Sequence, residues 1–227
     1  MQPDDPRTIW EDVPAGDLIL RIRRPPSAED LIDEQEFAHD ERLPYWAEVW
    51  PSARVLCGVL ARMDLAGCSV IELGAGIGTG AMVAATRGAT ALATDWYPEA
   101  VGFARWNARN LGLHMDAEVM DWRDPPPAVL DRAPFDLIVG ADILYEGRNG
   151  VALGALIPAL CGPATRVIIA DPRRPDARPF VDAMQRAGWT HRRDDLPVPG
   201  RIDETGPIVH VHSFTPPPGH HHKPVVI

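Results

Sequence analysis

The sequence predicts an α/β fold in which helices cover both faces of a mostly parallel sheet, and three observations predict it. Over the last two thirds of the chain, short apolar runs alternate with segments of helical pattern through short links, the order that gives parallel strands connected by helices. Residues 135–140 are almost entirely apolar, as in a strand whose two faces are both covered. Another apolar run, residues 68–73, leads directly into Gly74, Gly76 and Gly78, which predicts a tight turn where a ligand can approach the backbone.

The remaining elements follow from hydrophobic spacing and from turn residues. The expected strands are apolar or alternating segments: residues 17–23, 68–73, 90–95, 115–120, 135–140, 166–170, 189–193 and 208–214. The expected helices have recognisable ends: residues 27–39, 51–63, 79–87, 98–111, 149–160 and 175–187. Pro51 suits a first helical turn, Gly88 and Gly112 suit helix ends, and the prolines at 125–127 predict a loop. No helical pattern separates the last two strands, so we expect them to form an antiparallel end of the sheet.

The chain is expected to consist of one main domain with a segment at each end. Residues 1–44 are expected to form an N-terminal extension with a strand and a helix, residues 45–215 the α/β domain, and residues 216–227 a mobile, proline-rich tail. Of the 227 residues, 45% are hydrophobic, enough for a sizeable core.

Composition excludes several classes of function. The net charge of −10 argues against broad binding of nucleic acid or of an anionic membrane. The chain has no apolar run of membrane-spanning length, and its start, MQPDDPR, does not resemble a signal peptide. Cys57, Cys68 and Cys161 are far apart and form no CxxC pair, which favours reduced thiols in a cytoplasmic protein over a disulfide or a metal site.

Acidic or aromatic residues close several predicted strands, at the edge where α/β proteins bind ligands. Asp95 lies about twenty residues beyond the glycines, where a carboxylate can bind ribose hydroxyls, although it also precedes a helix and could cap it. Asp121 could bind an adenine edge or serve only a turn, and Trp122 could cover an adenine or fill the core. Asp142 could act at a reaction site or only end its strand.

The glycine turn alone does not identify the nucleotide. Gly76, Gly78, Gly80 and Ala81 also fit the GxGxxA form of the dinucleotide-binding fingerprint, and Asp95 would serve there as well. A nicotinamide-dependent oxidoreductase is therefore an alternative on this evidence.

Longer motifs favour a different cofactor. ELGAGIGTG, the Asp95 strand end and the Asp121-Trp122 strand end resemble the seven-strand S-adenosylmethionine-dependent methyltransferases. The segments PYWAEVWPSA and ADILYE resemble the protein lysine methyltransferase group of that superfamily, which has a Trp-Pro motif before the first core strand and a D-x-x-Y motif after the fourth. PYWAEVWP and ADPRRP most resemble the subgroup that acts on the electron transfer flavoprotein β subunit, but Ser52 and Arg173 stand where that subgroup usually has glycine.

The resemblance, which spans about residues 44–189, implies a Rossmann-like seven-stranded sheet with an antiparallel last strand, S-adenosylmethionine as the cofactor, and a protein substrate. It implies catalytic roles for Asp142 and Tyr145, which would face the incoming amine. The implied cofactor-binding residues follow the four strand ends and the Trp-Pro motif: Trp50, Glu72, Gly74, Ala75, Gly76, Gly78, Asp95, Trp96, Asp121, Trp122 and Ala141. In this interpretation Glu72 and the glycines contact the methionine part, Asp95 the ribose, and Asp121 with Trp122 the adenine.

Methyl transfer of this kind is a direct displacement that depends on holding two reactants in line. A lysine amine must first lose its proton, and an aromatic slot built from Tyr45, Trp46, Trp50 and Tyr145 would favour the neutral form. Two further alternatives stay open at this point: a methyltransferase of small molecules, for which residues 1–44 could supply a lid, and a cofactor-binding regulator without turnover.

Three other groups of residues have simpler interpretations. The histidines at 220–222 sit in the proline-rich tail and are expected to be solvated and not to bind a metal. His210 and His212 alternate along a strand and are expected to be exposed. Arg173, Arg174 and Arg178 are expected to begin a solvated helix, or else to dock an acidic partner.

Overall fold

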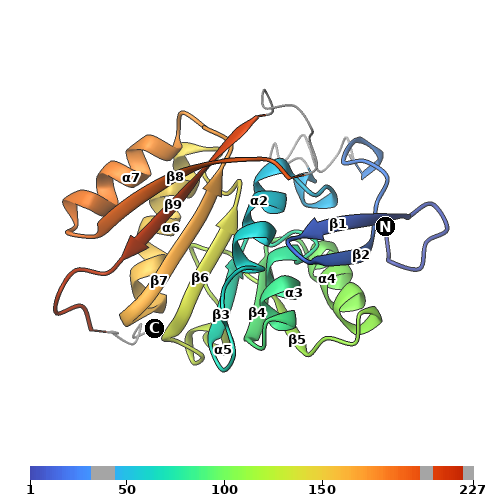
Figure 1. Cartoon of the computed structure of the whole chain (residues 1–227), viewed down its shortest axis with the longest axis horizontal. Coiled ribbons are helices and arrows are strands. Elements are labelled where there is room, and N and C mark those ends of the chain that lie inside the picture. The colour runs from blue at the N-terminus through green and yellow to red at the C-terminus, as the bar shows by residue number, and fades with distance from the viewer. Residues whose placement is uncertain (32–43, 200–206, 222–227) are drawn as a thin grey trace.

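A seven-stranded sheet forms the centre of the computed structural model, which describes residues 1–31, 44–199 and 207–221 (Figure 1). Its strands are β3 (Ser69–Leu73), β4 (Thr90–Asp95), β5 (Met115–Val119), β6 (Phe135–Ala141), β7 (Cys161–Asp171), β8 (Thr190–Pro197) and β9 (Ile208–Thr215). Their order across the sheet is β5-β4-β3-β6-β7-β9-β8. Every paired neighbour is parallel except β9, which runs antiparallel to both β7 and β8. The predicted fold class and its antiparallel last strand are confirmed.

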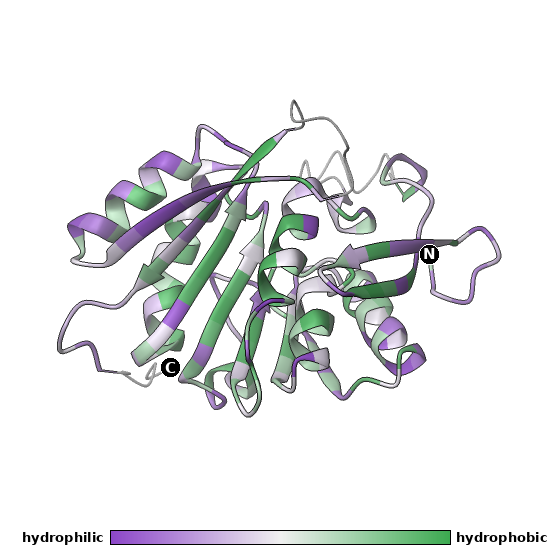
Figure 2. Ribbon diagram, viewed as in Figure 1, coloured by the Kyte–Doolittle hydropathy of each residue, from purple (hydrophilic) through white to green (hydrophobic). Residues whose placement is uncertain are grey.

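Helices cover the two faces of this sheet. They are α2 (Pro51–Leu60), α3 (Thr79–Thr86), α4 (Pro98–Asn110), α5 (Pro127–Leu130), α6 (Gly147–Leu160) and α7 (Ala177–Arg186), with short 3-10 turns η1 (Glu29–Leu31) and η2 (Tyr45–Ala47). Successive residues of β3 face opposite layers: Val70 packs in the core on the α2–α4 side, and Ile71 packs in the core on the α6–α7 side. This explains the continuous apolar character of the central strands (Figure 2). No helix within the described ranges has the length and apolar character that crossing a bilayer requires.

The structure corrects several predicted boundaries. A strand that the sequence did not reveal, β1 (Ile9–Ala15), pairs with β2 (Leu18–Arg24) in a separate antiparallel hairpin. Its acidic residues and Pro14 obscure the strand pattern, because proline and acids are depleted in strands. Pro127 begins the one-turn helix α5, where a loop was expected. Of the helix expected over residues 27–39, only the turn η1 falls within the described residues, and the rest lies outside them.

The exposure expected for the two strand histidines is wrong for His212, which is only 5% exposed. β9 is an internal strand between β7 and β8, so its side chains are covered by neighbours. The Nδ1 atom of His212 lies 2.9 Å from Nε2 of His191, and burial lowers the pKa of His212 to about 4. The cysteines are free thiols: Cys57 and Cys161 are buried, and Cys68 is half-buried.

Asn107 of α4 connects the N-terminal hairpin to the main sheet layer. Its side chain is fully buried, its Oδ1 accepts a hydrogen bond from the Arg23 backbone N–H at 2.7 Å, and its Nδ2 donates to the Arg23 carbonyl at 2.9 Å. The hairpin then buries Val13 and Ile22 in the core shared with α2 and α4. The Asn107 amide therefore forms hydrogen bonds with both the backbone N–H and the backbone C=O of Arg23 in β2.

We expect Asn107→Ala to lower the free energy of unfolding by about 2–4 kcal/mol, because it leaves the backbone N–H and C=O of Arg23 buried or only partly hydrated. Urea unfolding measures the loss, and amide exchange should show the hairpin opening first. Asn110→Ala at the exposed end of the same helix is the matched control and should change stability by less than about 0.5 kcal/mol. Equal effects of the two substitutions would contradict this role for Asn107.

Candidate active site

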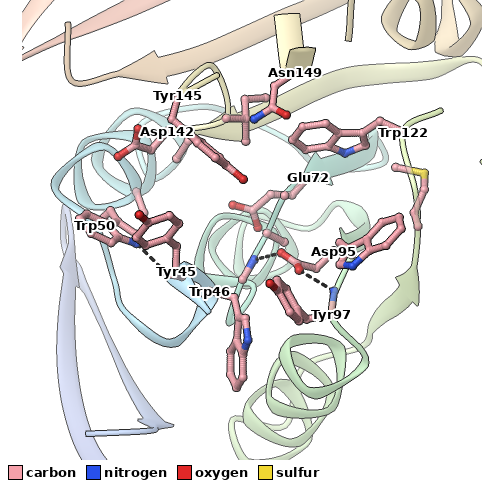
Figure 3. A pocket seen from close by; sticks show the side chains of 18 of the residues that line it. Tyr45, Trp46, Trp50, Glu72, Asp95, Tyr97, Trp122, Asp142, Tyr145 and Asn149 are labelled. Atoms are coloured by element: carbon pink, nitrogen blue, oxygen red, sulfur yellow. Dashed lines mark hydrogen bonds between the residues drawn. The ribbon is translucent and has the colours of Figure 1, made fainter. Parts of the chain in front are cut away.

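A cavity of about 560 Å³ lies at the carboxyl ends of β3, β4, β5 and β6 (Figure 3). All the site residues expected from the sequence line it except Gly78. The lining comes from the loop after β3, from Asp95 at the end of β4, from Asp121 just after β5, and from the segment that begins at Ala141 at the end of β6. Trp50, immediately before α2, closes one side. Residues as far apart in the chain as Tyr45 and Arg174 therefore share one cavity, largely because parallel strands end at the same edge.

Two of the loop glycines are required by their backbone conformation and by their neighbours. Gly74 has φ +61°, and a Cβ there would lie 2.8 Å from the Ile143 side chain and 3.1 Å from the Trp122 ring. Gly76 has φ +53°, and a Cβ would lie 3.0 Å from the Trp46 carbonyl oxygen. The loop therefore presents bare backbone to the cavity.

Gly78 has a different role from the one expected. It precedes α3 with φ +82°, and a Cβ there would lie 2.9 Å from the Cβ of Ala104 on α4. The residue thus allows α3 and α4 to pack closely, and it does not line the cavity.

Glu72 is buried beneath the loop and supports the start of α3. Its side chain is almost fully buried, and its Oε2 accepts a hydrogen bond from the Ala81 N–H at 2.7 Å. Burial raises the pKa of Glu72 to about 7, while the backbone N–H groups of Gly80 and Ala81 act in the opposite direction. A Cβ on Gly80 would collide with this carboxylate, so the glycine that also fits the dinucleotide fingerprint is required here by Glu72.

The pKa of Glu72 predicts a pH-dependent loss of stability in the protein without ligand. The pKa of Glu72 in the folded protein, about 7, exceeds its reference value of 4.5. The contribution of this carboxyl to the free energy of unfolding is therefore complete below pH 4.5 and is lost as the pH rises through 7. Glu72→Gln should remove this loss. Between pH 5 and pH 8, the free energy of unfolding of the variant should therefore rise by up to about 3 kcal/mol relative to that of the wild type. Urea unfolding at each pH measures the difference, in which the contribution of the remote His212 cancels, whereas Asp95 contributes through its repulsion of Glu72. Parallel curves for the two proteins would refute the assignment.

Asp95 ties together the loops after β3 and β4. Its Oδ2 accepts a hydrogen bond from the Gly76 N–H at 2.8 Å, and its Oδ1 accepts one from the Tyr97 N–H at 3.0 Å. Burial raises the pKa of Asp95 to about 6. The alternative that Asp95 caps α4 is not what the structure shows, since Tyr97 is the N-cap residue and Asp95 binds the turn before it. Asp95 also lines the cavity.

The Asp121 end of β5 carries a layered polar and aromatic group. The Arg123 guanidinium donates to both carboxylate oxygens of Asp121, at 3.0 and 2.8 Å, and lies 5.6 Å from the centre of the Trp96 ring. Trp122 is half-buried beside Gly74 and lines the cavity. The Nδ2 atom of Asn149 is buried at the same cavity, beside Tyr145.

Asp142 has a partner that the sequence did not predict. It adopts φ +56° with a side chain only 8% exposed, and both carboxylate oxygens face Arg174: Nε donates to Oδ1 at 3.0 Å and Nη2 to Oδ2 at 3.2 Å. Arg174 follows β7, and its backbone N–H donates to Oδ1 of Asp171 at 2.7 Å. The expectation of a solvated helix start is therefore wrong for Arg174, which lines the cavity.

Three of the four expected aromatic residues form a group at the cavity. The ring of Tyr45 makes edge contacts with Trp50 and Tyr145 at centroid distances of 5.8 and 6.0 Å. Tyr45 and Tyr145 are 41% and 39% exposed, so their rings border solvent. Trp46 also lines the cavity, but its ring is buried against Phe103 and points away from the cavity centre (Figure 3).

The fold is that of the Rossmann-like methyltransferases. A TehB-like S-adenosylmethionine-dependent methyltransferase from Corynebacterium glutamicum superposes with a TM-score of 0.54 and 19% identity, over 80% of this chain and 93% of that one. Magnesium protoporphyrin IX methyltransferase from Synechocystis, solved with its bound cofactor, gives a TM-score of 0.54 and 16% identity, over 73% of this chain and 77% of that one.

The sequence profile of the lysine methyltransferase family matches residues 36–187, and the chain belongs to this family. Protein N-lysine methyltransferase METTL21A of Danio rerio is 36% identical over 140 residues, 57% of this chain and 62% of that protein. Protein-lysine methyltransferase METTL21E of Bos taurus is 38% identical over 63% of this chain and 53% of its own length. Histone-arginine methyltransferase METTL23 of Xenopus laevis is 32% identical over 46% of this chain and 47% of its own length. The chain thus spans less than two thirds of each of these relatives.

Proposed function

We propose that this protein is an S-adenosylmethionine-dependent methyltransferase that methylates a lysine side chain of a protein. One observation carries the proposal: the glycine loop with Asp95 shares a single cavity with Asp142 and the rings of Tyr45 and Tyr145. The cavity therefore combines a nucleotide cradle with an anionic, aromatic place for an amine. Membership of the lysine methyltransferase family supports the same conclusion.

The residues present fit the cofactor. The volume lies within the range of about 300–1,000 Å³ that holds small ligands. Asp95 and Asp121 supply carboxylate oxygens for hydroxyl and amino groups, and the close neighbours of Gly74 and Gly76 keep bare backbone at the cavity. The buried amide of Asn149 lines the same cavity and can donate a hydrogen bond. When bound, S-adenosylmethionine supplies an electrophilic methyl group on a positively charged sulfur.

The chain itself must orient the amine and remove its proton. A lysine ammonium has a reference pKa of about 10.4, so at neutral pH nearly all of it is protonated. Tyr45, Trp50 and Tyr145 would exclude water from its last carbons, and partial desolvation favours the neutral amine. Asp142 would then accept a hydrogen bond from that amine and receive the proton on its way to solvent.

A lysine suits this arrangement better than an arginine. A guanidinium is held best by a carboxylate with two free oxygens, but both oxygens of Asp142 already accept hydrogen bonds from Arg174. A primary amine needs only one remaining lone pair. The similarity of PYWAEVWP and ADPRRP to the corresponding subgroup makes the electron transfer flavoprotein β subunit the first protein substrate to test. The free thiols agree with a cytoplasmic location.

The test is incubation with tritiated S-adenosylmethionine and a bacterial lysate, with purified electron transfer flavoprotein as a second acceptor, followed by mass spectrometry of labelled bands. We expect label on lysine in one or a few proteins. Label that enters only low-mass products would favour the small-molecule alternative, and label on arginine would reject the lysine assignment. Saturable binding of NAD without binding of S-adenosylmethionine would overturn the methyltransferase proposal.

A further inference from the structure

Arg174 covers the one carboxylate that the proposed reaction assigns to the amine. The Asp142 side chain is 8% exposed, whereas that of Arg174 is 41% exposed, so the guanidinium is the more exposed partner of the pair. Within the described ranges, no other cationic side chain forms an ion pair with Asp142. The side-on contact through Nε and Nη2 uses both oxygens.

The local backbone holds this arginine in place. Arg173 has φ +73°, and the Arg174 N–H is fixed by a 2.7 Å hydrogen bond to Asp171, a fully buried carboxylate at the end of β7. Asp142 has a left-handed backbone as well, and its own N–H donates to the Ala170 carbonyl at 2.8 Å. Two adjacent strand ends are thus shaped to bring one guanidinium onto one carboxylate.

A carboxylate beside a lysine amine has two opposing effects. A negative charge within about 4–6 Å favours the ammonium and so strengthens its binding, but it also keeps the amine in its unreactive, protonated form. A cation paired with that carboxylate reduces the second effect and leaves its lone pairs able to accept hydrogen bonds. The pKa of the bound amine should therefore differ between a protein with this cation and one without it, since the other charged groups at the site stay the same.

We infer that Arg174 is a positioning residue that orients Asp142 and offsets its charge, so that Asp142 serves the incoming lysine as a hydrogen-bond acceptor and not as a counter-ion that keeps it protonated. The inference rests on the proposed function and explains how the lysine ammonium loses its proton at this site. The methyl acceptor it requires is a primary amine, which loses one proton to solvent through Asp142.

Other charged or titratable groups line the same cavity or act on Arg174. The constant background of the experiment includes Tyr45, Glu48, Tyr145, Glu146, Arg148 and Asp171. Glu146 and Arg148 are paired with each other. Burial raises the pKa of Asp171 to about 6, so Asp171 is ionised over the alkaline range where the amine is titrated.

The experiment is single-turnover methyl transfer from tritiated S-adenosylmethionine to the proteins of a bacterial lysate, with the enzyme in excess, between pH 6.5 and pH 10. We expect the midpoint of the rate–pH curve to move up by at least about one pH unit in Arg174→Gln, because a cation beside the amine is lost. The rate at pH 7.5 should fall about tenfold, and most of it should return at high pH. Arg174→Lys keeps the charge and should keep the wild-type midpoint.

Controls separate this role from a structural one. Arg178→Gln, at an 88% exposed side chain nearby, should leave the whole curve unchanged, and cofactor affinity should match the wild type in the Arg174 variants. A uniform rate loss in Arg174→Gln with an unmoved midpoint overturns the inference. If Arg174→Gln does not fold, a raised midpoint in Arg174→Lys overturns it. Absence of methyl transfer by the wild type is a different result, which rejects the proposed function first.

Discussion

Asp142→Asn is expected to lower methyl transfer by about a hundredfold or more, because a neutral amide can neither receive the proton of the amine nor orient it as a carboxylate does. Asparagine is the right replacement, since it tolerates the left-handed backbone, φ +56°, that Asp142 adopts. The Asp142 side chain lines the cavity beside Arg174, where the proposed function places the incoming amine. Gly76 and Asp95, the residues proposed to hold the cofactor, should keep their own hydrogen bond in the variant.

Calorimetric titration with S-adenosylmethionine should therefore give an affinity within about threefold of the wild type, while the single-turnover rate falls. Asp131→Asn, at an exposed position after α5, is the matched control and should leave both quantities unchanged. Full activity of Asp142→Asn would remove Asp142 from the mechanism. Loss of cofactor affinity together with activity would place it among the cofactor contacts instead.

Gly74→Ala is expected to weaken cofactor binding more than tenfold and to lower the free energy of unfolding by about 2–3 kcal/mol. Two effects add at this position. An alanine at φ +61° is strained, and its Cβ would lie 2.8 Å from Ile143 and 3.1 Å from the Trp122 ring, both of which line the cavity. One of these walls must move into the space that the cofactor would occupy.

The chain offers a control that isolates the strain. Gly112 has φ +68°, but a Cβ there would meet nothing within 4 Å. Gly112→Ala should therefore cost only about 1 kcal/mol and leave cofactor affinity unchanged. Calorimetry and urea unfolding on both variants measure the two effects. Equal losses of affinity in the two variants would mean that the collision at Gly74 has no influence on the cavity.

Much of the framework could be predicted because its signals are local. The run from 68 to 73 became β3, and the segment 90–95 became β4 with the same bounds. Hydrophobic spacing and glycine stops report what a short segment does, whatever surrounds it. The hairpin partner β1 was missed for the same reason, since Pro14 and the acids of this strand weaken its local pattern, and its pairing with β2 is set by packing on α2 and α4.

The site was predicted in position but not in all its contacts. Asp95 and Asp121 could be placed because parallel strands end together. The ion pair between Asp142 and Arg174 joins residues 32 positions apart, and nothing in the ADPRRP segment says which of its arginines turns toward the cavity. Likewise, Gly78 appeared to belong to the cofactor loop, whereas its contact with Ala104 shows a packing role.

The sequence by itself determined the alternation of strands and helices, the glycine loop, and the acids that close the strands, because each of these depends on a few neighbouring residues. Only the tertiary structure decided which groups meet: the side chain of Arg174 with that of Asp142, the side chain of Asn107 with the backbone of Arg23, and the ring of His212 with that of His191. Such contacts depend on the distance between segments and on what covers them. Burial and charge pairing are therefore properties of the folded chain, and they set the protonation states on which the proposed chemistry depends.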